Sequence, residues 1–144
     1  MSAEKSSKEK FLPFEEIEHT ADLALRVRGK DLAELCVHAA QGMFSLMRCE
    51  PGEETVPVTR RVSVQAADPE TLLVEWLNEL LYIGESNREC YDRFQVLHLE
   101  PTKLVAEIAG RRREPGRVIK AATYSNLHIA QTPGGYEATV TFDV

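Results

Sequence analysis

The sequence predicts a single α+β domain in which two main helices pack on one face of a mixed or mostly antiparallel β-sheet. Three observations favour this class. The chain has 144 residues, about the length of one domain. Two segments carry apolar residues at helical spacing, and several others alternate as strands joined by hairpins. We expect residues 1–12 to form a flexible tail and residues 13–144 to form the domain.

A period-two alternation predicts the first strand, within residues 14–28. The apolar positions that share one face are Leu23, Leu25 and Val27. Such alternation is typical of a strand with one buried face. Asp22 has the opposite parity, together with Arg26 and Arg28, so we expect its carboxylate to point away from the core.

Capping signals predict where the two helices begin. The first starts after Asp31, and Glu34 three residues later completes a pattern that resembles a capping box. The second starts after Asp68, with Pro69 at the first helical position, where its missing N–H costs nothing. We expect this second helix to stop near Gly84 and to be followed by a polar turn.

The remaining segments predict strands and loops. Strands are expected at 56–66, at 94–99 and 104–109 as a hairpin, and at 123–129 and 136–142 as a closing hairpin. Residues 111–116 contain three arginines and a Pro-Gly pair, which interrupt the alternation and predict a flexible loop.

Charge is unevenly distributed along the chain. Seventeen basic against 23 acidic residues give a net charge of −6, which argues against a large phosphate-tracking surface. Residues 111–120 carry +4, and the remainder therefore carries −10. The basic residues of this segment are Arg111, Arg112, Arg113, Arg117 and Lys120. Such a segment is either a solvated turn or a contact for phosphate or an acidic partner.

Three cysteines without a C-x-x-C motif predict neither a disulfide framework nor a thiolate zinc site. Cys36, Cys49 and Cys90 are expected to be free thiols, which favours a cytoplasmic location. We also expect no export signal and no membrane span. No nucleophile–base spacing, P-loop or dinucleotide fingerprint occurs, so no catalytic residues are predicted.

Two aspartates near opposite ends of the sequence share the solvent-facing parity. If the first and last strands pair, Asp22, Asp143 and the terminal carboxylate of Val144 can converge at one rim of the sheet. Hard cations such as Ca²⁺ and Mg²⁺ bind such oxygen groups. From the pattern alone, two ordinary solvent-facing carboxylates are the favoured interpretation, and the metal site is the alternative.

Four motifs in order resemble those of the archease family, small proteins that assist tRNA-splicing RNA ligases. They are FEEIEHTADL at 14–23, LVEWLNELLY at 73–82, IKAATY at 119–124 and FDV at 142–144. The resemblance implies an archease-like fold and a metal site at Asp22, Asp143 and Val144, where Val144 offers only main-chain or terminal oxygens. Calcium is the implied ion, with magnesium or manganese as alternatives.

The resemblance also implies a role without catalysis by the chain itself. Archeases promote guanylylation and multiple turnover of a GTP-dependent RNA ligase that joins 2′,3′-cyclic phosphate or 3′-phosphate ends to 5′-hydroxyl ends. The chain would act in tRNA splicing or RNA repair and meet RNA only through the ligase, away from membranes. Lys120, Arg111, Arg112 and Arg113 become candidate contacts for the partner or for phosphate.

The sequence also departs from the family pattern. Many relatives carry a histidine in the loop before the IKAATY motif, and many have Tyr-His where this chain has Tyr124-Ser125. Roles tied to those histidines are not carried over. The alternative functions are a small metal-dependent hydrolase acting on nucleotides and a chaperone-like interaction module.

Overall fold

The computed structural model describes residues 12–17, 23–50 and 56–144. Its elements in chain order are β1 (Phe14–Ile17), β2 (Leu23–Gly29), α2 (Leu32–Met47), β3 (Val58–Gln65), α3 (Pro69–Asn87), β4 (Glu89–Glu100), β5 (Lys103–Arg112), β6 (Ala121–Thr123), β7 (Ala130–Thr132) and β8 (Gly135–Asp143). The strands form a five-stranded sheet of order β1-β2-β8-β6, with β7 also paired to β8, and a three-stranded sheet of order β3-β5-β4. All the pairings are antiparallel.

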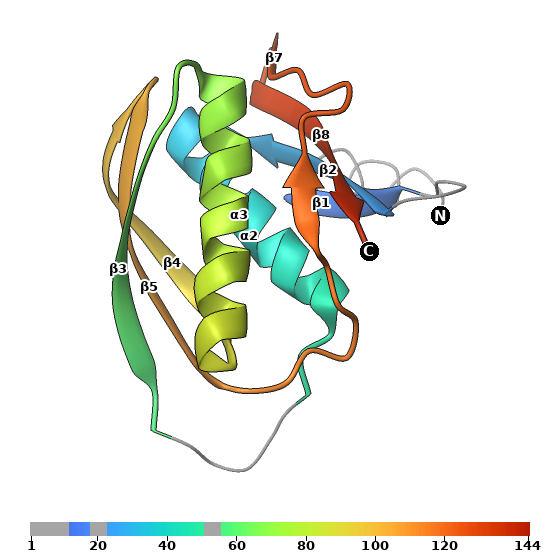
Figure 1. Cartoon of the computed structure of the whole chain (residues 1–144). Helices are drawn as coiled ribbons and strands as arrows, with labels where there is room; N and C mark the ends of the chain where they lie inside the picture. The colour runs from blue at the N-terminus through green and yellow to red at the C-terminus, as the bar shows by residue number, and fades with distance from the viewer. Residues whose placement is uncertain (1–11, 18–22, 51–55) are drawn as a thin grey trace, which may run out of the picture.

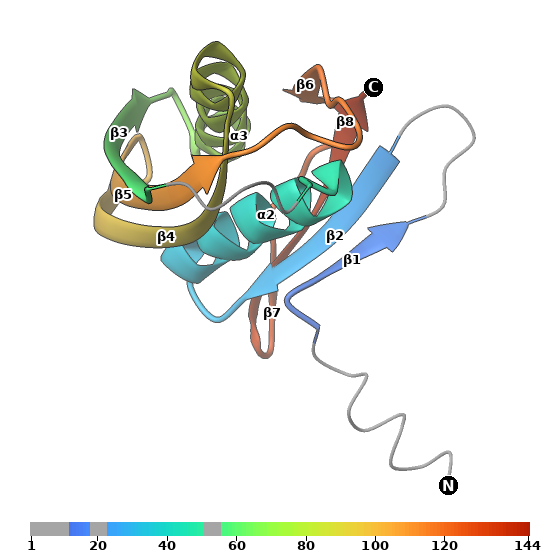
Figure 2. The same cartoon turned by 90° about the horizontal axis from the view of Figure 1, so that it is seen from below.

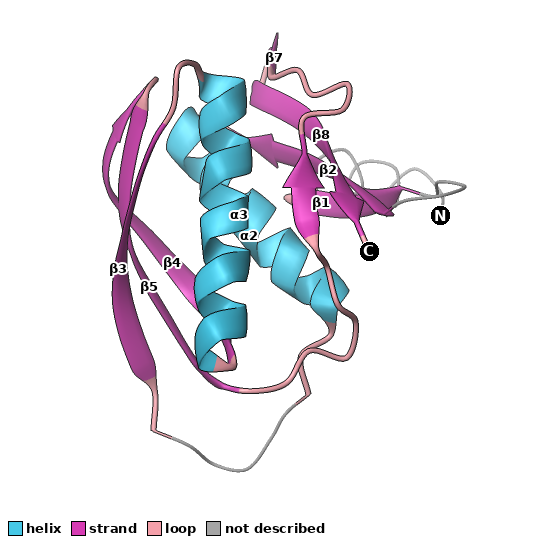
Figure 3. Ribbon diagram, viewed as in Figure 1, coloured by secondary structure: helices cyan, strands magenta, loops and turns pink. Residues whose placement is uncertain are grey.

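Both helices lie between the two sheets (Figures 1 and 2). Helix α2 packs on β2 and β4, and α3 packs on β3 and β6, so each helix contacts both sheets. Figure 3 shows the same arrangement by secondary structure, with strands on either side of the helices. The predicted α+β class with two main helices is confirmed, and the strands are divided between two sheets instead of forming one.

The predicted helix starts are confirmed at atomic detail. The Asp31 carboxylate accepts a hydrogen bond from the Glu34 N–H at 2.8 Å, and Glu34 accepts in turn from the Lys30 N–H at 2.8 Å. The Asp68 carboxylate accepts from the Thr71 N–H at 2.8 Å, ahead of Pro69. Side-chain oxygens therefore satisfy the N–H groups that each helix start leaves unpaired.

The second helix is longer than predicted. It continues past Gly84 to Asn87, and Arg88 ends it in the left-handed conformation with φ 57°. Gly84 therefore does not end the helix. Glycine is required there for packing, because a Cβ would lie 2.8 Å from the Glu89 carbonyl oxygen. Strand β4 then begins at once, so the predicted polar turn over 85–93 is wrong.

Both predicted hairpins exist, with shifted bounds. β4 and β5 pair around residues 101–102, and β7 pairs with β8 around residues 133–134. The first arm of the closing hairpin is only Ala130–Thr132, because the chain turns earlier, where the Leu127 N–H donates to the Tyr124 carbonyl at 3.2 Å and Asn126 has φ 55°. The predicted strand over 123–129 is therefore largely irregular.

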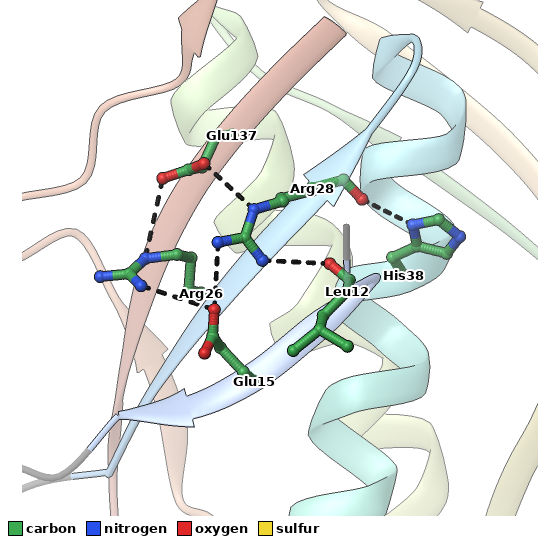
Figure 4. Close-up of polar contacts among 6 residues, drawn as sticks. All are labelled: Leu12, Glu15, Arg26, Arg28, His38 and Glu137. Atoms are coloured by element: carbon green, nitrogen blue, oxygen red, sulfur yellow. Dashed lines mark hydrogen bonds and ion pairs between the residues drawn. The ribbon is translucent and has the colours of Figure 1, made fainter. Parts of the chain in front are cut away.

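The outer face of the five-stranded sheet carries a ladder of ion pairs, drawn in Figure 4. Arg28 lies 3.0 Å from Glu15 and 3.2 Å from Glu137, and Arg26 lies 3.5 Å from Glu15. His38 contacts the Arg28 carbonyl through its Nδ1 at 2.6 Å. The two arginines leave the core as their parity predicted, while the apolar face of β2 packs on the helices.

The core between the sheets is continuous and apolar. Trp76, Leu25, Val27, Val140 and Phe142 are each no more than 1% exposed. Trp76 donates its indole N–H to the Cys36 carbonyl at 2.9 Å, so its one polar atom is satisfied. No helix among the described residues combines the length and apolarity needed to cross a bilayer.

Candidate functional site

The strand that follows residue 22 and the last strand of the chain are neighbours in the sheet. β2 pairs antiparallel with β8, and Leu23 lies opposite Phe142. This is the pairing on which the predicted meeting of Asp22 and Asp143 depends. Asp22 lies outside the described residues, so the structure describes only the β8 side of that rim.

Asp143 is the last residue of β8, and its side chain is exposed because the alternation buries Phe142 instead. The Asp143 carbonyl accepts from the Lys120 N–H at 2.8 Å, and Asp143 lies opposite Ala121 of β6. Val144 follows and is 49% exposed. We term Lys120, Asp143 and Val144 the β8 end, a set of charged and oxygen-bearing groups whose backbone is held by β6.

Side chains of α3 hold β6 in place. The Asn78 amide donates to the Ala122 carbonyl at 3.1 Å and accepts from the Ala122 N–H at 2.7 Å. The Tyr124 hydroxyl donates to the Glu75 carboxylate at 2.7 Å, and this hydrogen bond raises the pKa of Tyr124. The motifs at 73–82 and 119–124 therefore meet in space. The sequence pattern did not single out Asn78, whose only signal was a polar residue beside the apolar stripe.

The donors of the β8 end are suited to a hard cation. The Asp143 carboxylate and the Val144 backbone supply oxygen atoms only, which is the donor type that calcium, magnesium and manganese take. In residues 12–17, 23–50 and 56–144, no three His, Cys, Asp or Glu side chains gather into a metal-binding group. A complete site at this rim needs a further ligand, and Asp22 is the residue that precedes β2.

The first half of the arginine segment belongs to a strand. Arg111 and Arg112 are the last residues of β5 and pair with the start of β4. The N–H of Arg113 then donates to the Arg88 carbonyl at 3.0 Å. The predicted flexible loop over 111–116 is therefore wrong in its first two residues, because the β4 pairing extends as far as Arg112.

The second half of the segment caps α2. The N–H groups of Gly116 and Arg117 donate to the carbonyls of Arg48 and Met47 at 3.0 and 2.9 Å. Helix C-termini leave such carbonyls without intrahelical partners. A Cβ at Gly116 would lie 2.6 Å from the Arg48 oxygen, so this close approach requires glycine.

Arginines gather where the two helices end. A cavity of about 510 Å³ is lined by Arg48, Arg111 and Arg113, and another of about 410 Å³ by Arg88, Arg112 and Arg113. We term these five residues, Arg48, Arg88, Arg111, Arg112 and Arg113, the arginine end. Lys120, which the sequence grouped with them, lines neither cavity and lies at the β8 end.

Two of the cysteines are paired, which corrects the prediction of three free thiols and removes the argument for a cytoplasmic location that was based on it. Cys49 and Cys90 form a disulfide with a Cα–Cα distance of 6.5 Å, although 41 positions separate them in sequence. Packing of α2 against β4 brings them together, and sequence spacing does not report such tertiary contacts. Cys36 is a free thiol as predicted, and burial raises its pKa to about 12.

A buried carboxylate stabilises the start of β4. Glu89 is 6% exposed and contacts the Arg60 guanidinium with both oxygens, at 2.7 and 2.9 Å. The Tyr91 hydroxyl donates to the same carboxylate at 2.6 Å. The Arg60 guanidinium holds the pKa of Glu89 below its ordinary value, while burial raises the pKa of Tyr91. The sequence gave no signal for this group, because polar Glu89 was assigned to an exposed turn.

The fold, the β8 end and the arginine end define a class of protein. It is a small α+β domain of two antiparallel sheets separated by two helices, and its last strand lies in the middle of one sheet. Residues 14–144 match the archease protein family. An archease of Methanosarcina mazei is 31% identical over 140 residues, covering 91% of this chain and 95% of the relative. An archease of Methanopyrus kandleri is 31% identical, covering 92% and 100%. The chain belongs to the archease family.

Solved structures share the fold. The solution structure of protein 1598 of Methanobacterium thermoautotrophicum aligns with a TM-score of 0.66 at 24% identity, over 92% of this chain and 99% of that one. The crystal structure of an archease of Thermotoga maritima, described as a possible chaperone, aligns with a TM-score of 0.63 at 22% identity. That alignment covers 89% of this chain and 94% of the Thermotoga chain. These similarities confirm the α+β architecture.

Proposed function

We propose that this chain is a protein cofactor of a GTP-dependent RNA ligase. It promotes guanylylation of the ligase and permits multiple turnover as the ligase joins 2′,3′-cyclic phosphate or 3′-phosphate ends to 5′-hydroxyl ends. The proposal is carried by the family match over residues 14–144. In this role the chain is not itself a catalyst, and it works in the cytoplasm in tRNA splicing or RNA repair.

The proposed metal site consists of Asp22, Asp143 and Val144, with calcium as the ion and magnesium or manganese as substitutes. Support comes from the oxygen-only donors of the β8 end and from the pairing of β2 with β8. Bound there, the ion supplies positive charge. The chain's own contribution is to hold the Asp143 backbone through β6, so that only its side chain has to be ordered when the ion binds.

Basic side chains are proposed to contact the ligase or its phosphate-bearing ligands. Lys120 does so beside the metal site, and Arg111, Arg112 and Arg113 do so from the arginine end. Arginine matches carboxylate and phosphate geometry with two parallel N–H donors, whereas lysine acts as a point charge. These contacts reconcile a protein of net charge −6 with work on RNA that is held by its partner.

The activity is tested by mixing the chain with its cognate ligase, GTP and a divalent metal. Formation of guanylylated ligase is then followed over repeated turnovers of RNA ends. We expect faster and repeated guanylylation compared with the ligase alone. Equal progress with and without the chain would overturn the proposal. A panel of nucleotides incubated with the chain alone is the control, and turnover there would favour a hydrolase.

The metal site is tested by calorimetric titration of calcium and magnesium. We expect binding by the wild type and its loss in the Asp22→Asn/Asp143→Asn variant, with Asp92→Asn as a control carboxylate on β4. Binding that survives the double substitution contradicts the assignment. Ligase activation without any metal binding would favour a chaperone-like role, in keeping with the description of the Thermotoga structure.

A further inference from the structure

The larger cavity at the arginine end is lined by basic side chains from two separate segments of the chain. Arg48 is the C-cap of α2, Arg111 is the last but one residue of β5, and Arg113 directly follows that strand. Among the described residues that line this cavity, Asp92 is the one acidic side chain, so together they carry a formal charge of +2. Guanidinium groups from distant segments that face one cavity are typical of sites for phosphate or carboxylate.

Aromatic side chains also line the cavity. They are those of Phe14, Phe44 and Tyr91, and the rings of Phe44 and Tyr91 pack edge to face at 5.6 Å. Phe14 is half-buried, whereas Phe44 and Tyr91 are nearly fully buried, so Phe14 offers most of the accessible ring surface. A flat base can stack on such a ring while a phosphate contacts the arginines.

Polar side chains of α2 also line the cavity. Gln41 and Ser45 are spaced four residues apart, which places them along one face of the helix. Gln41 and Ser45 are exposed and provide hydrogen-bond donors and acceptors for a sugar or a base edge. A volume of about 510 Å³ is in the range of pockets that hold one small ligand.

The backbone around the cavity is fixed before any ligand arrives. The disulfide Cys49–Cys90 lines the cavity and joins α2 to β4. The N–H of Arg113 is tied to the Arg88 carbonyl, and Gly116 is tied to Arg48. Preorganised donors bind more tightly because less conformational freedom is lost on binding.

The sheet is also adapted to this cavity. The pairing of β4 with β5 shifts register between Tyr91 and Arg93, which leaves Asp92 without a ladder partner. Gly110 lies opposite Tyr91, where a Cβ would collide with the Cys90 backbone. Such bulges redirect side chains and are common beside binding sites. Here the bulge places Asp92 at the cavity.

We propose that this cavity binds the phosphate of a single nucleotide unit, with Arg48 and Arg113 on the phosphate and Phe14 against the base. The unit is either a free nucleotide or the phosphorylated end of an RNA strand, since both present the same phosphate and base. The inference extends the proposed phosphate contact of Arg113 by adding Arg48, Phe14 and the surface cavity that they line, and it does not require ligase activation.

The test is calorimetric titration of the full chain with guanosine, guanosine 5′-monophosphate, and a short single-stranded RNA with and without a 3′-phosphate. We expect the phosphorylated probes to bind at least about tenfold more tightly than their unphosphorylated forms. Each charge-assisted hydrogen bond raises the affinity by about tenfold or more. Stronger binding of the monophosphate identifies a free nucleotide, and stronger binding of the phosphorylated RNA identifies a strand end.

Variants separate the cavity from general charge. Arg48→Gln/Arg113→Gln should weaken binding of the phosphorylated probe at least about tenfold. Arg61→Gln/Lys103→Gln removes two charges from the sheet of β3 and β5, and should change binding less than about threefold. Both variants should keep the wild-type circular dichroism and calcium titration, which shows that they are folded.

Three results would overturn the inference: no binding of any phosphorylated probe at millimolar concentration, equal binding of phosphorylated and unphosphorylated probes, or equal weakening in the two double variants. Failure here is distinct from failure of the proposed function. If the chain accelerates guanylylation but binds no nucleotide, only the proposed nucleotide site is rejected. If it binds a nucleotide but does not accelerate guanylylation, only the ligase role is rejected.

Discussion

The β8 end and the arginine end are both held by backbone hydrogen bonds, but they are built in different ways. The β8 end lies at the end of a central strand, and the register of β8 with β2 and β6 determines its position. The arginine end lies where two helices stop, and cross-links between distant segments determine its shape. One region presents the exposed carboxylate of Asp143, and the other presents guanidinium groups.

One short segment connects the two regions. After Arg113 the chain caps α2 through Gly116, and by Lys120 it has reached Asp143. The charge of +4 over residues 111–120 is therefore shared between both regions and does not form one patch. Residues that are neighbours in sequence therefore belong to separate regions, and substitutions that affect one region and spare the other distinguish the two.

Removal of the disulfide should produce the largest change in stability. Closing a loop across a separation of 41 positions stabilises the folded chain by about 3–4 kcal/mol in the chain-entropy description. We expect Cys49→Ser/Cys90→Ser to lower the free energy of unfolding by that amount in urea denaturation. It should also weaken nucleotide binding while calcium binding at the β8 end is retained.

Reducing agent provides the control for this prediction. The wild type should lose stability in dithiothreitol, whereas the double serine variant should be insensitive to it. Identical unfolding midpoints for the oxidised and reduced wild type would show that the bond does not cross-link the arginine end in solution.

Glu89→Gln should cost about 2–3 kcal/mol, because it breaks a buried charged pair with Arg60 and weakens the Tyr91 hydrogen bond. Arg60 holds the pKa of Glu89 below its ordinary value. The contribution of the pair is therefore complete above the unfolded carboxyl pKa of about 4.3 and is lost as the pH falls through the folded-state value.

Denaturation at several pH values measures this effect. The difference between wild type and Glu89→Gln should be full at neutral pH and should shrink in acid. The exposed Glu85→Gln, on the last turn of α3, should change stability by less than about 0.5 kcal/mol. A difference that stays constant down to strongly acidic pH would show that the Arg60 pair is not the cause.

Asn78→Ala should have the smallest effect on stability, about 1–2 kcal/mol, from the loss of two hydrogen bonds to Ala122. It should weaken calcium binding at the β8 end and leave nucleotide binding unchanged, which is the reverse of the disulfide variant. Asn78→Asp keeps the acceptor for the Ala122 N–H, so it should lie between wild type and alanine. Unchanged calcium affinity in Asn78→Ala would show that β6 does not position the β8 end.

Local signals in the sequence predicted much of the fold. Asp31 and Asp68 act through backbone groups three residues away, so their roles can be read from spacing alone. The parity of Arg26 and Asp143 likewise follows from strand geometry. The Cys49–Cys90 bond and the Arg60–Glu89 pair join residues far apart in sequence, and only the packing of elements reveals them.

The candidate sites follow the same division. Asp143 and Val144 could be proposed from the sequence because they end the last predicted strand and the chain, and Arg111–Arg113 because they are consecutive. Arg48 and Arg88 were missed, since each is a single arginine at the end of a helix, and their relation to Arg113 depends on backbone contacts between distant segments.

Asp22, Asp143 and Val144 are proposed to hold a metal ion that ligase activation needs. The most direct test of this proposal is the amount of guanylylated ligase formed over repeated turnovers with wild type and with Asp22→Asn/Asp143→Asn. We predict that the double variant accelerates guanylylation at least about tenfold less than the wild type. Its circular dichroism should match that of the wild type, which shows that it is folded. Full acceleration by a double variant that no longer binds calcium would contradict the account.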